Sequence, residues 1–299
     1  MQIMKTDKKY LIIGANGLIG RSVAQQLDGI YNWQGTYYNR KALGLLPLDV
    51  TKKSDVSKIF ETTRPNYVIH CAGLAGGVDF CENNPDLARS FHLGATIYLG
   101  EQCQKYGAKL VFISSDYVFD GKKKEYYEDD SPRPLNIYGK LKLKSEIWIT
   151  NNLQDYVIVR TTNVYGWDPL TKTPNYLMSL YFKLMKRELF KAPTFLWGRP
   201  TYVKDLASAI IELSCSETIG IFHIVGASFV NRFQWAKRMC QLANWEQRLV
   251  VPQKIIPENM IPRPLKSSMN TDKFSKQFKT KLRGLDEGLK AFLDDMKRS

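Results

Sequence analysis

Cysteine is scarce in this sequence of 299 residues, and the thiols are widely separated. Their number is odd and no CxxC pair occurs, so the sequence contains neither a disulfide framework nor a zinc knuckle. The histidines and carboxylates also lack the spacing of metal ligands. We therefore expect reduced thiols and no metal site. The cysteines are Cys71, Cys81, Cys103, Cys215 and Cys240.

Long apolar segments are absent as well. No run approaches the ~20 apolar residues that a membrane-spanning helix needs, and the N-terminus, MQIMKTDKKY, lacks the apolar core of a signal peptide. We therefore expect a cytoplasmic protein with no membrane partner.

Acidic residues are outnumbered by basic ones. The 43 Lys and Arg residues against 29 Asp and Glu give a formal net charge of +14, which attracts anions such as nucleotides. The basic residues are spread along the chain, and no motif of the common nucleic-acid-binding folds occurs. A solvated basic surface is the simpler interpretation, and we expect no nucleic-acid partner.

Apolar strand-like runs alternate with amphipathic helix-like segments over the first half of the chain. This alternation predicts an α/β fold with a doubly wound parallel sheet covered by helices on both faces. The expected strands are residues 9–13, 34–38, 67–71, 110–114 and 156–160. The expected helices are residues 20–27, 54–62, 85–106 and 138–151, with Ser54 as the N-cap of the second.

After about Gly166 prolines interrupt the alternation, which predicts a smaller and less regular C-terminal lobe. Here we expect a helix at residues 176–186, a strand at 222–225, an extended loop at 252–264 and a terminal amphipathic helix at 285–297.

Glycines with the spacing G-x-x-G-x-x-G follow the first expected strand directly and precede the first helix. They are Gly14, Gly17 and Gly20. Glycine is needed where the chain turns tightly and where backbone approaches a pyrophosphate, and the helix N-terminus adds N–H donors. The segment around them, which includes Asn16, Leu18 and Ile19, predicts a dinucleotide site.

The end of the second expected strand indicates which dinucleotide binds. The segment GTYYNR, ending at Arg40, has no carboxylate for a ribose 2′-hydroxyl and one Arg that suits a 2′-phosphate. We therefore predict NADP(H), with NAD(H) as the alternative. Further positions expected to line the cofactor are Asp49, Val50, Cys71, Ala72 and Gly73.

A Tyr-x-x-x-Lys pair, Tyr138 and Lys142, lies on one face of an expected helix. An ammonium beside a phenol favours the phenolate, so Lys142 is expected to lower the pKa of Tyr138 and to hold the nicotinamide ribose. Ser115 ends an expected strand, at the edge where ligands bind in such sheets, and its hydroxyl suits a substrate carbonyl.

Together these motifs resemble the dTDP-4-dehydrorhamnose reductase family of extended short-chain dehydrogenases/reductases. The resemblance covers most of the chain, in blocks at residues 14–20, 78–85, 114–121, 138–146, 160–166, 200–207, 220–223 and 263–273. It implies a Rossmann domain over residues 7–166, with contributions from about 195–225. It also implies a substrate-binding lobe over 167–194 and 226–299.

The resemblance further implies NADPH-dependent reduction of the C4 keto group of a 6-deoxy-4-keto nucleotide sugar. Tyr138 is then the proton donor within the catalytic set Ser115, Tyr138 and Lys142, of which Tyr138 and Lys142 also bind the cofactor. For substrate binding we single out Ser115, Asp116, Asn163, Arg199 and Arg263. The related dehydratases carry Glu where this chain has Tyr117, so dehydration is not expected.

Two departures from the family pattern bear on specificity. Phe91-His92 stands where the family usually has Val-Asn, and Asn163 stands where it usually has a Trp near the substrate. The alternatives to a reductase are a non-catalytic, NADP-binding regulatory subunit and a nucleotide-sugar epimerase of the same superfamily. A homodimer is expected by superfamily habit alone.

Overall fold

The computed structural model describes residues 6–171 and 173–298. Within them, seven parallel strands form one sheet in the order β11-β6-β5-β4-β1-β2-β3. The order reverses between β1 and β4, which makes the crevice there the expected ligand site. The strands are β1 (Thr6–Ile13), β2 (Tyr31–Tyr37), β3 (Leu46–Pro47), β4 (Tyr67–His70), β5 (Lys109–Ser115), β6 (Tyr156–Thr161) and β11 (Gly220–His223).

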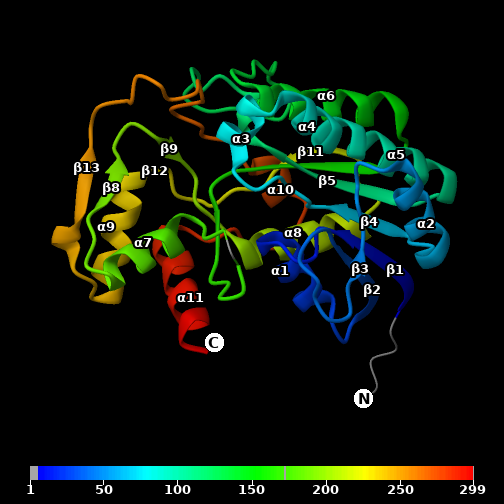
Figure 1. Cartoon of the computed structure of the whole chain (residues 1–299), viewed down its shortest axis with the longest axis horizontal. Coiled ribbons are helices and arrows are strands. Elements are labelled where there is room, and N and C mark those ends of the chain that lie inside the picture. Colours follow the sequence, from blue (N-terminus) through cyan, green and yellow to red (C-terminus); the bar gives the residue numbers. More distant parts are fainter. Residues whose placement is uncertain (1–5, 172, 299) are drawn as a thin grey trace.

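Helices cover both faces of this sheet, as predicted (Figure 1). Successive side chains of a strand point to opposite faces, so Ile12 packs with Val23 on one side and Ile13 packs with Phe60 on the other. One layer holds α1 (Leu18–Leu27) and α8 (Val203–Cys215), and the other holds α2 (Lys53–Thr63), α5 (Ala95–Tyr106) and α6 (Ile137–Asn152).

Two helix predictions need correction. Lys52, not Ser54, occupies the N-cap of α2, because the turn at Asp49 fixes the helix entry upstream. The long helix expected over residues 85–106 contains a π-helical turn, Ser90–Gly94, between α4 (Pro85–Arg89) and α5. Such turns often lie at functional sites.

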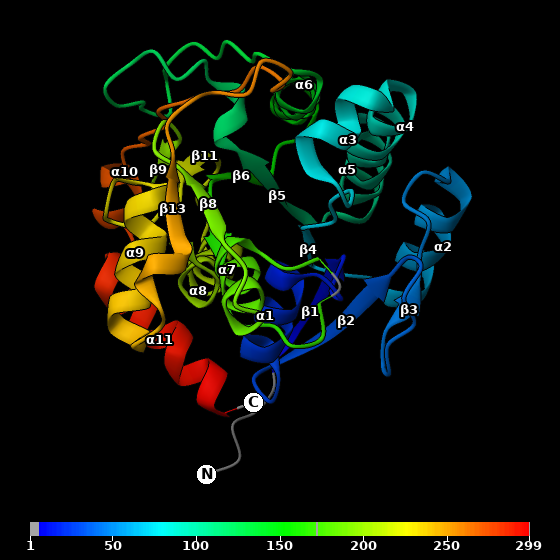
Figure 2. The ribbon, with the colours of Figure 1, turned by 60° about the vertical axis from the view of Figure 1, so that its left-hand side comes forward.

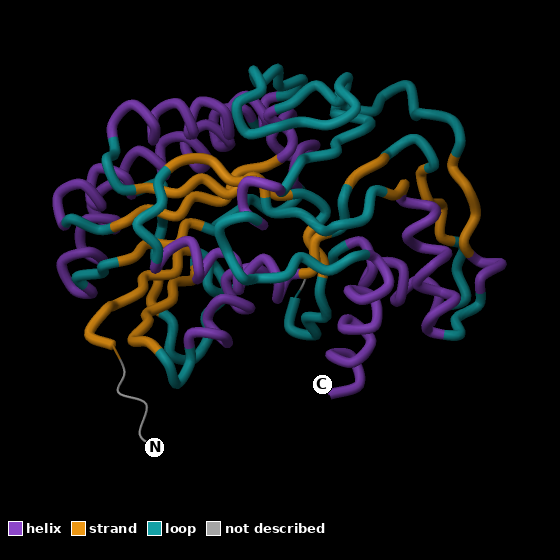
Figure 3. The backbone as a smooth tube through the Cα atoms, turned by 180° about the vertical axis from the view of Figure 1, so that it is seen from behind, coloured by secondary structure: helices purple, strands orange, loops and turns teal. Residues whose placement is uncertain are grey.

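The second lobe has its own hydrophobic core and lies beside the sheet (Figures 1 and 2). Short strand pairs and helices build it, and the loop expected at residues 252–264 begins within a strand. Its elements are α7 (Tyr176–Met185), β8 (Phe190–Pro193), β9 (Trp197–Gly198), β12 (Val230–Asn231), α9 (Arg232–Ala243), β13 (Val250–Gln253) and α11 (Leu285–Arg298). Figure 3 shows these short strands apart from the main sheet.

The remaining α-helices and β-strands are short. They are α3 (Gly77–Asn83), β7 (Val164–Tyr165), β10 (Thr201–Tyr202) and α10 (Asp272–Ser275). The strand predicted at residues 222–225 begins two residues earlier, at Gly220. Among the helices of the described residues, none combines the length and apolarity that a membrane crossing requires.

Candidate active site

The turn between β1 and α1 brings backbone segments too close together for side chains. Gly14 has φ +84°, and a Cβ on it would lie 2.8 Å from the Cα of Ala72, just after β4. A Cβ on Gly20 would lie 2.4 Å from the carbonyl oxygen of Gly14. Gly17, the exposed N-cap of α1, has no side-chain cap, so the first N–H groups of the helix are open to a ligand.

Two arginines lie against this turn. The guanidinium of Arg21 donates to the backbone and side-chain oxygens of Asn16, at 2.9 and 3.1 Å. Arg40 donates to the same backbone oxygen at 3.4 Å and to the carbonyl of Leu170, while the Asn16 amide donates back to the Arg40 carbonyl. The buried Asp168 lies 3.6 Å from the Arg21 Nε. Two cations beside a turn of exposed N–H groups suit a phosphorylated dinucleotide.

The other cofactor positions follow β3 and β4. Partial burial raises the pKa of Asp49, but hydrogen bonds from Thr51 and the charge of Lys52 outweigh it and hold that pKa below its ordinary value. Val50, beside it, is buried. Cys71 donates its thiol to the carbonyl of Ile13 at 3.2 Å, and burial raises its pKa to about 12.

Ala72 and Gly73 continue from this strand end. Ala72 is the residue that closes on Gly14, and a Cβ on Gly73 would meet no atom within 4 Å. This edge therefore has open space next to the glycine turn.

The structure brings Ser115, Tyr138 and Lys142 together. Ser115 ends β5, and the other two lie on the first turns of α6, whose N-cap Asn136 accepts the N–H of Gly139 at 2.9 Å. Ser115 lies close enough to Tyr138 for its hydroxyl to lower the pKa of the phenol. The Nζ of Lys142 lies 5.9 Å from the centre of the Tyr138 ring and donates to the carbonyl of Ile113 at 2.8 Å.

Burial controls the charge states of this group. It raises the pKa of Tyr138 above its ordinary value, although the Ser115 hydroxyl acts in the opposite direction. This net shift is opposite to the one expected from Lys142, because the loss of hydration dominates. Burial also lowers the pKa of Lys142 to about 8, against the charge of Glu146.

His92 lies against Tyr138, which sequence reasoning did not foresee. Its ring centre is 5.2 Å from that of Tyr138 at an interplanar angle of 81°, and its Nε2 is 3.6 Å from the sulfur of Cys81. The π-helical turn leaves its carbonyl free to accept hydroxyls from Thr96 and Ser145. Burial lowers the pKa of His92 to about 2, so this imidazole is neutral and packs as a core residue.

The predicted substrate residues differ in how many of their polar atoms already bond to other protein atoms. Asp116 is buried beside Ser115, which donates to it at 3.0 Å, and burial raises its pKa. Arg199 donates through Nε, Nη1 and Nη2 to Ser268, Ala227 and Glu125. Arg263 donates to Asp79 at 2.7 Å and to the Ile261 carbonyl.

Asn163 has a partner that no motif indicated. It adopts a left-handed conformation, φ 52°, and its Oδ1 accepts the Nη2 of Arg232 at 2.5 Å. Arg232 is the first residue of α9, in the second lobe. The only local signal there is the capping box between Asn231 and Gln234, which predicts a helix start and not a site.

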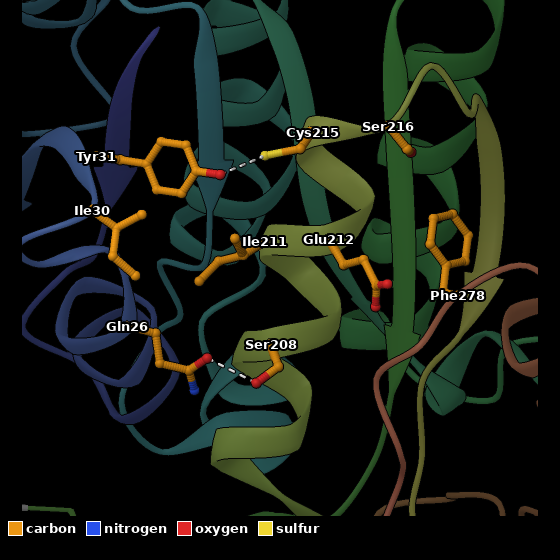
Figure 4. Close-up of a pocket in the computed structure, with 9 residues that line it drawn as sticks. All are labelled: Gln26, Ile30, Tyr31, Ser208, Ile211, Glu212, Cys215, Ser216 and Phe278. Atoms are coloured by element: carbon orange, nitrogen blue, oxygen red, sulfur yellow. Dashed lines mark hydrogen bonds between the residues drawn. The ribbon is translucent and has the colours of Figure 1, made fainter. Parts of the chain in front are cut away.

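A cavity of about 530 Å³ lies at the opposite edge of the sheet (Figure 4). It is bounded by the ends of α1 and α8 and by the start of β2, and Tyr31 and Cys215 face one another across it. It therefore does not belong to the candidate active site. The described residues hold no group of three or more His, Cys, Asp or Glu side chains that could bind a metal ion.

Comparison with known proteins agrees with this geometry. The family described as RmlD substrate binding domain matches residues 8–298. The chain belongs to this family. The RmlD family is one of NAD(P)-dependent reductases of nucleotide sugars, which confirms the resemblance and the sheet architecture.

Individual relatives within the RmlD family carry different names. A dTDP-4-dehydrorhamnose reductase of Aggregatibacter actinomycetemcomitans is 31% identical over 76% of this chain and 76% of its own. Methionine adenosyltransferase 2 subunit beta of Xenopus tropicalis is 29% identical over 90% of this chain and 82% of its own. A dTDP-4-dehydrorhamnose reductase from Bacillus anthracis, solved in complex with NADP, superposes with a TM-score of 0.87 at 29% identity. That superposition covers 98% of this chain and 100% of the other.

Proposed function

We propose that the protein reduces the C4 keto group of a 6-deoxy-4-keto nucleotide sugar with NADPH. The observation that carries the proposal is the convergence of Ser115, Tyr138 and Lys142 at the sheet edge that also holds the glycine turn. A purely structural protein has no need of a serine hydroxyl, a phenol and an ammonium brought together at this edge.

The residues around the glycine turn fit NADP. The exposed N–H groups of α1 suit the pyrophosphate, Arg40 suits the 2′-phosphate with Arg21 beside it, and Asp49 suits the adenine. When bound, the nicotinamide supplies the hydride. A relative at 29% identity that is solved with NADP supports this choice over NAD.

The chain's own residues supply the proton. The Tyr138 phenol is protonated at neutral pH, with its pKa raised further by burial, so it can donate its Oη proton to the carbonyl oxygen of the substrate. Ser115 redirects its hydroxyl, which donates to Asp116 in this structure, to the same carbonyl oxygen. Lys142 then stabilises the phenolate that remains.

The direct test is NADPH oxidation by the purified protein with 4-keto-6-deoxy sugar nucleotides carrying dTDP, GDP, UDP and CDP, with NADH in parallel. Turnover with one member establishes the reaction, the nucleotide and the cofactor together. Tight NADPH binding without turnover on any member would contradict the proposal.

A second candidate is a regulatory subunit that binds NADP without turnover. Its support is the match to methionine adenosyltransferase 2 subunit beta, which extends over 90% of this chain. Under this alternative, NADPH binding changes the affinity of the chain for a partner enzyme and Tyr138→Phe has no effect on that affinity. An epimerase would instead convert a nucleotide sugar with no net change in cofactor absorbance.

A further inference from the structure

Arg232 begins α9 in the second lobe, and most donors of its guanidinium make no hydrogen bond within the described residues. In the described residues, its side chain makes one hydrogen bond, the 2.5 Å contact of Nη2 with Asn163. A guanidinium has five N–H donors, so four remain. Arg199 differs, because its Nε, Nη1 and Nη2 all donate to protein acceptors.

Aromatic packing fixes the direction of this guanidinium. Its Cζ lies 4.6 Å from the ring centre of Tyr176 and 5.1 Å from that of Trp235, and these two rings stack on one another. The Tyr176 hydroxyl also donates to the backbone carbonyl of Arg232 at 2.8 Å. Cation–π contacts and the Asn163 bond therefore orient the free donors before any ligand arrives, which reduces the entropy lost on binding.

The sheet register places this group close to the catalytic pair. Thr161 is the register partner of Ser115 in the pairing of β6 with β5, and Asn163 follows two residues beyond the strand end. The charge of Arg232 also acts on Asp116 and on Tyr117, and the Tyr117 ring lies 5.6 Å from that of Tyr138. Arg232 thus approaches the reaction site from the second lobe.

Asn163 stands where the resembling family usually has a Trp. In this chain the amide oxygen at that position accepts a hydrogen bond from the guanidinium of α9. The departure at position 163 is therefore coupled to Arg232.

We propose that Arg232, oriented by Asn163, binds paired anionic oxygens of the nucleotide sugar and so determines which substrate the enzyme accepts. A planar fork of N–H groups matches the paired oxygens of the diphosphate, which are the anionic oxygens that a 6-deoxy-4-keto nucleotide sugar carries. This inference rests on the proposed nucleotide-sugar function.

Calorimetric titration of the full-length protein with UDP, UDP-glucose, UDP-glucuronate, dTDP and dTDP-glucose tests the proposal. Loss of a charge-assisted hydrogen-bonded contact in Arg232→Gln is expected to weaken binding by about 10- to 100-fold. If the loss extends to UDP and dTDP alone, the group bound is the diphosphate. A loss confined to UDP-glucuronate would overturn the inference, because the group bound would then be a sugar carboxylate that a 6-deoxy sugar lacks.

Matched variants separate binding from folding. Arg238→Gln removes a guanidinium from the same helix that pairs with Asp286 at the surface, and it is expected to bind every ligand as the wild type does. Asn163→Gly suits the left-handed backbone and keeps the charge of Arg232, so a smaller loss is expected. NADPH affinity reports that each variant is folded.

Equal affinity of the wild type and Arg232→Gln for every ligand that binds would overturn this inference and leave the proposed reductase function standing. A wild-type protein that binds NADPH but none of the nucleotides would overturn both. A loss in Arg232→Gln that is matched in Arg238→Gln would also overturn it, since a general charge effect would then suffice.

Discussion

At the scale of single residues, the site depends on how burial and charge are combined. In the proposed mechanism Tyr138 donates the proton. Burial raises the pKa of its phenol, and the Nζ of Lys142 lies 5.9 Å from its ring centre. The glycine turn relies on Arg40 and Arg21, which both donate to Asn16. Each of these roles can be removed by one substitution.

Tyr138→Phe is expected to lower kcat by about 10²-fold or more, because the general acid is lost while the ring is kept. NADPH affinity should stay within about twofold of the wild type, since the phenol is not what holds the phosphates. Steady-state kinetics and NADPH titration measure the two quantities. Unchanged kcat would remove Tyr138 from the mechanism.

Arg40→Asp is expected to shift the cofactor preference from NADPH toward NADH, because a carboxylate repels a 2′-phosphate and accepts ribose hydroxyls. The measurement is the ratio of kcat/KM for the two cofactors. Lys58→Asp, an equal charge change at an exposed position on α2, serves as the control. If both variants leave the same ratio as the wild type, Arg40 does not contact the 2′-phosphate.

At the scale of elements, the turn from β1 into α1 depends on both conformation and space. Gly14 combines φ +84° with a close approach to Ala72, whereas Gly44 has φ +76° and nothing within 4 Å of a built Cβ. The two glycines therefore separate the effect of a left-handed backbone from that of a steric clash.

Gly44→Ala is expected to reduce the free energy of unfolding by about 1–2 kcal/mol, the usual penalty for a left-handed L-residue. Gly14→Ala should reduce it by more, because β1 and the segment after β4 must also move apart. Denaturant unfolding measures the stability of both, and NADPH titration should show weaker binding for Gly14→Ala alone. Equal losses in the two variants would mean that the approach to Ala72 is not a constraint.

At the scale of the whole molecule, three buried histidines make stability depend on pH. Burial lowers the pKa of His70 to about 3, that of His92 to about 2 and that of His223 to about 3. The unfolded chain binds these protons near pH 6.5, so the folded state is favoured above that pH and loses stability as the pH falls below it. Burial raises the pKa values of Asp116 and Asp205. These two carboxyls therefore stabilise the folded state as the pH falls, in the lower pH range where carboxyl groups titrate.

Between about pH 7.5 and about pH 5.5, the free energy of unfolding is expected to fall by about 4 kcal/mol, or roughly 1.4 kcal/mol for each histidine. Urea unfolding at a series of pH values measures it. His92→Asn should make this fall smaller by roughly 1.4 kcal/mol, the contribution of one histidine. A flat profile across this range would show that the histidines gain protons without unfolding.

The local sequence predicted much of the fold and part of the candidate site. Apolar runs predicted the parallel strands, the glycine spacing predicted the turn after β1, and the four-residue separation placed Tyr138 and Lys142 on one helical face. The Ser54 cap and the unbroken helix over residues 85–106 were wrong. In the first case the turn at Asp49 outweighed the capping preference of Ser54. In the second a π-helical turn interrupts the helix.

The sequence by itself determined the family and the sheet, because those depend on residues within a few positions of one another or on strands of regular pattern. Only the tertiary structure decided that burial raises the pKa of Tyr138, and that Arg232 bonds to Asn163 from 69 positions away. Burial and long-range contacts exist only once the lobes pack together. No spacing rule along the chain contains them.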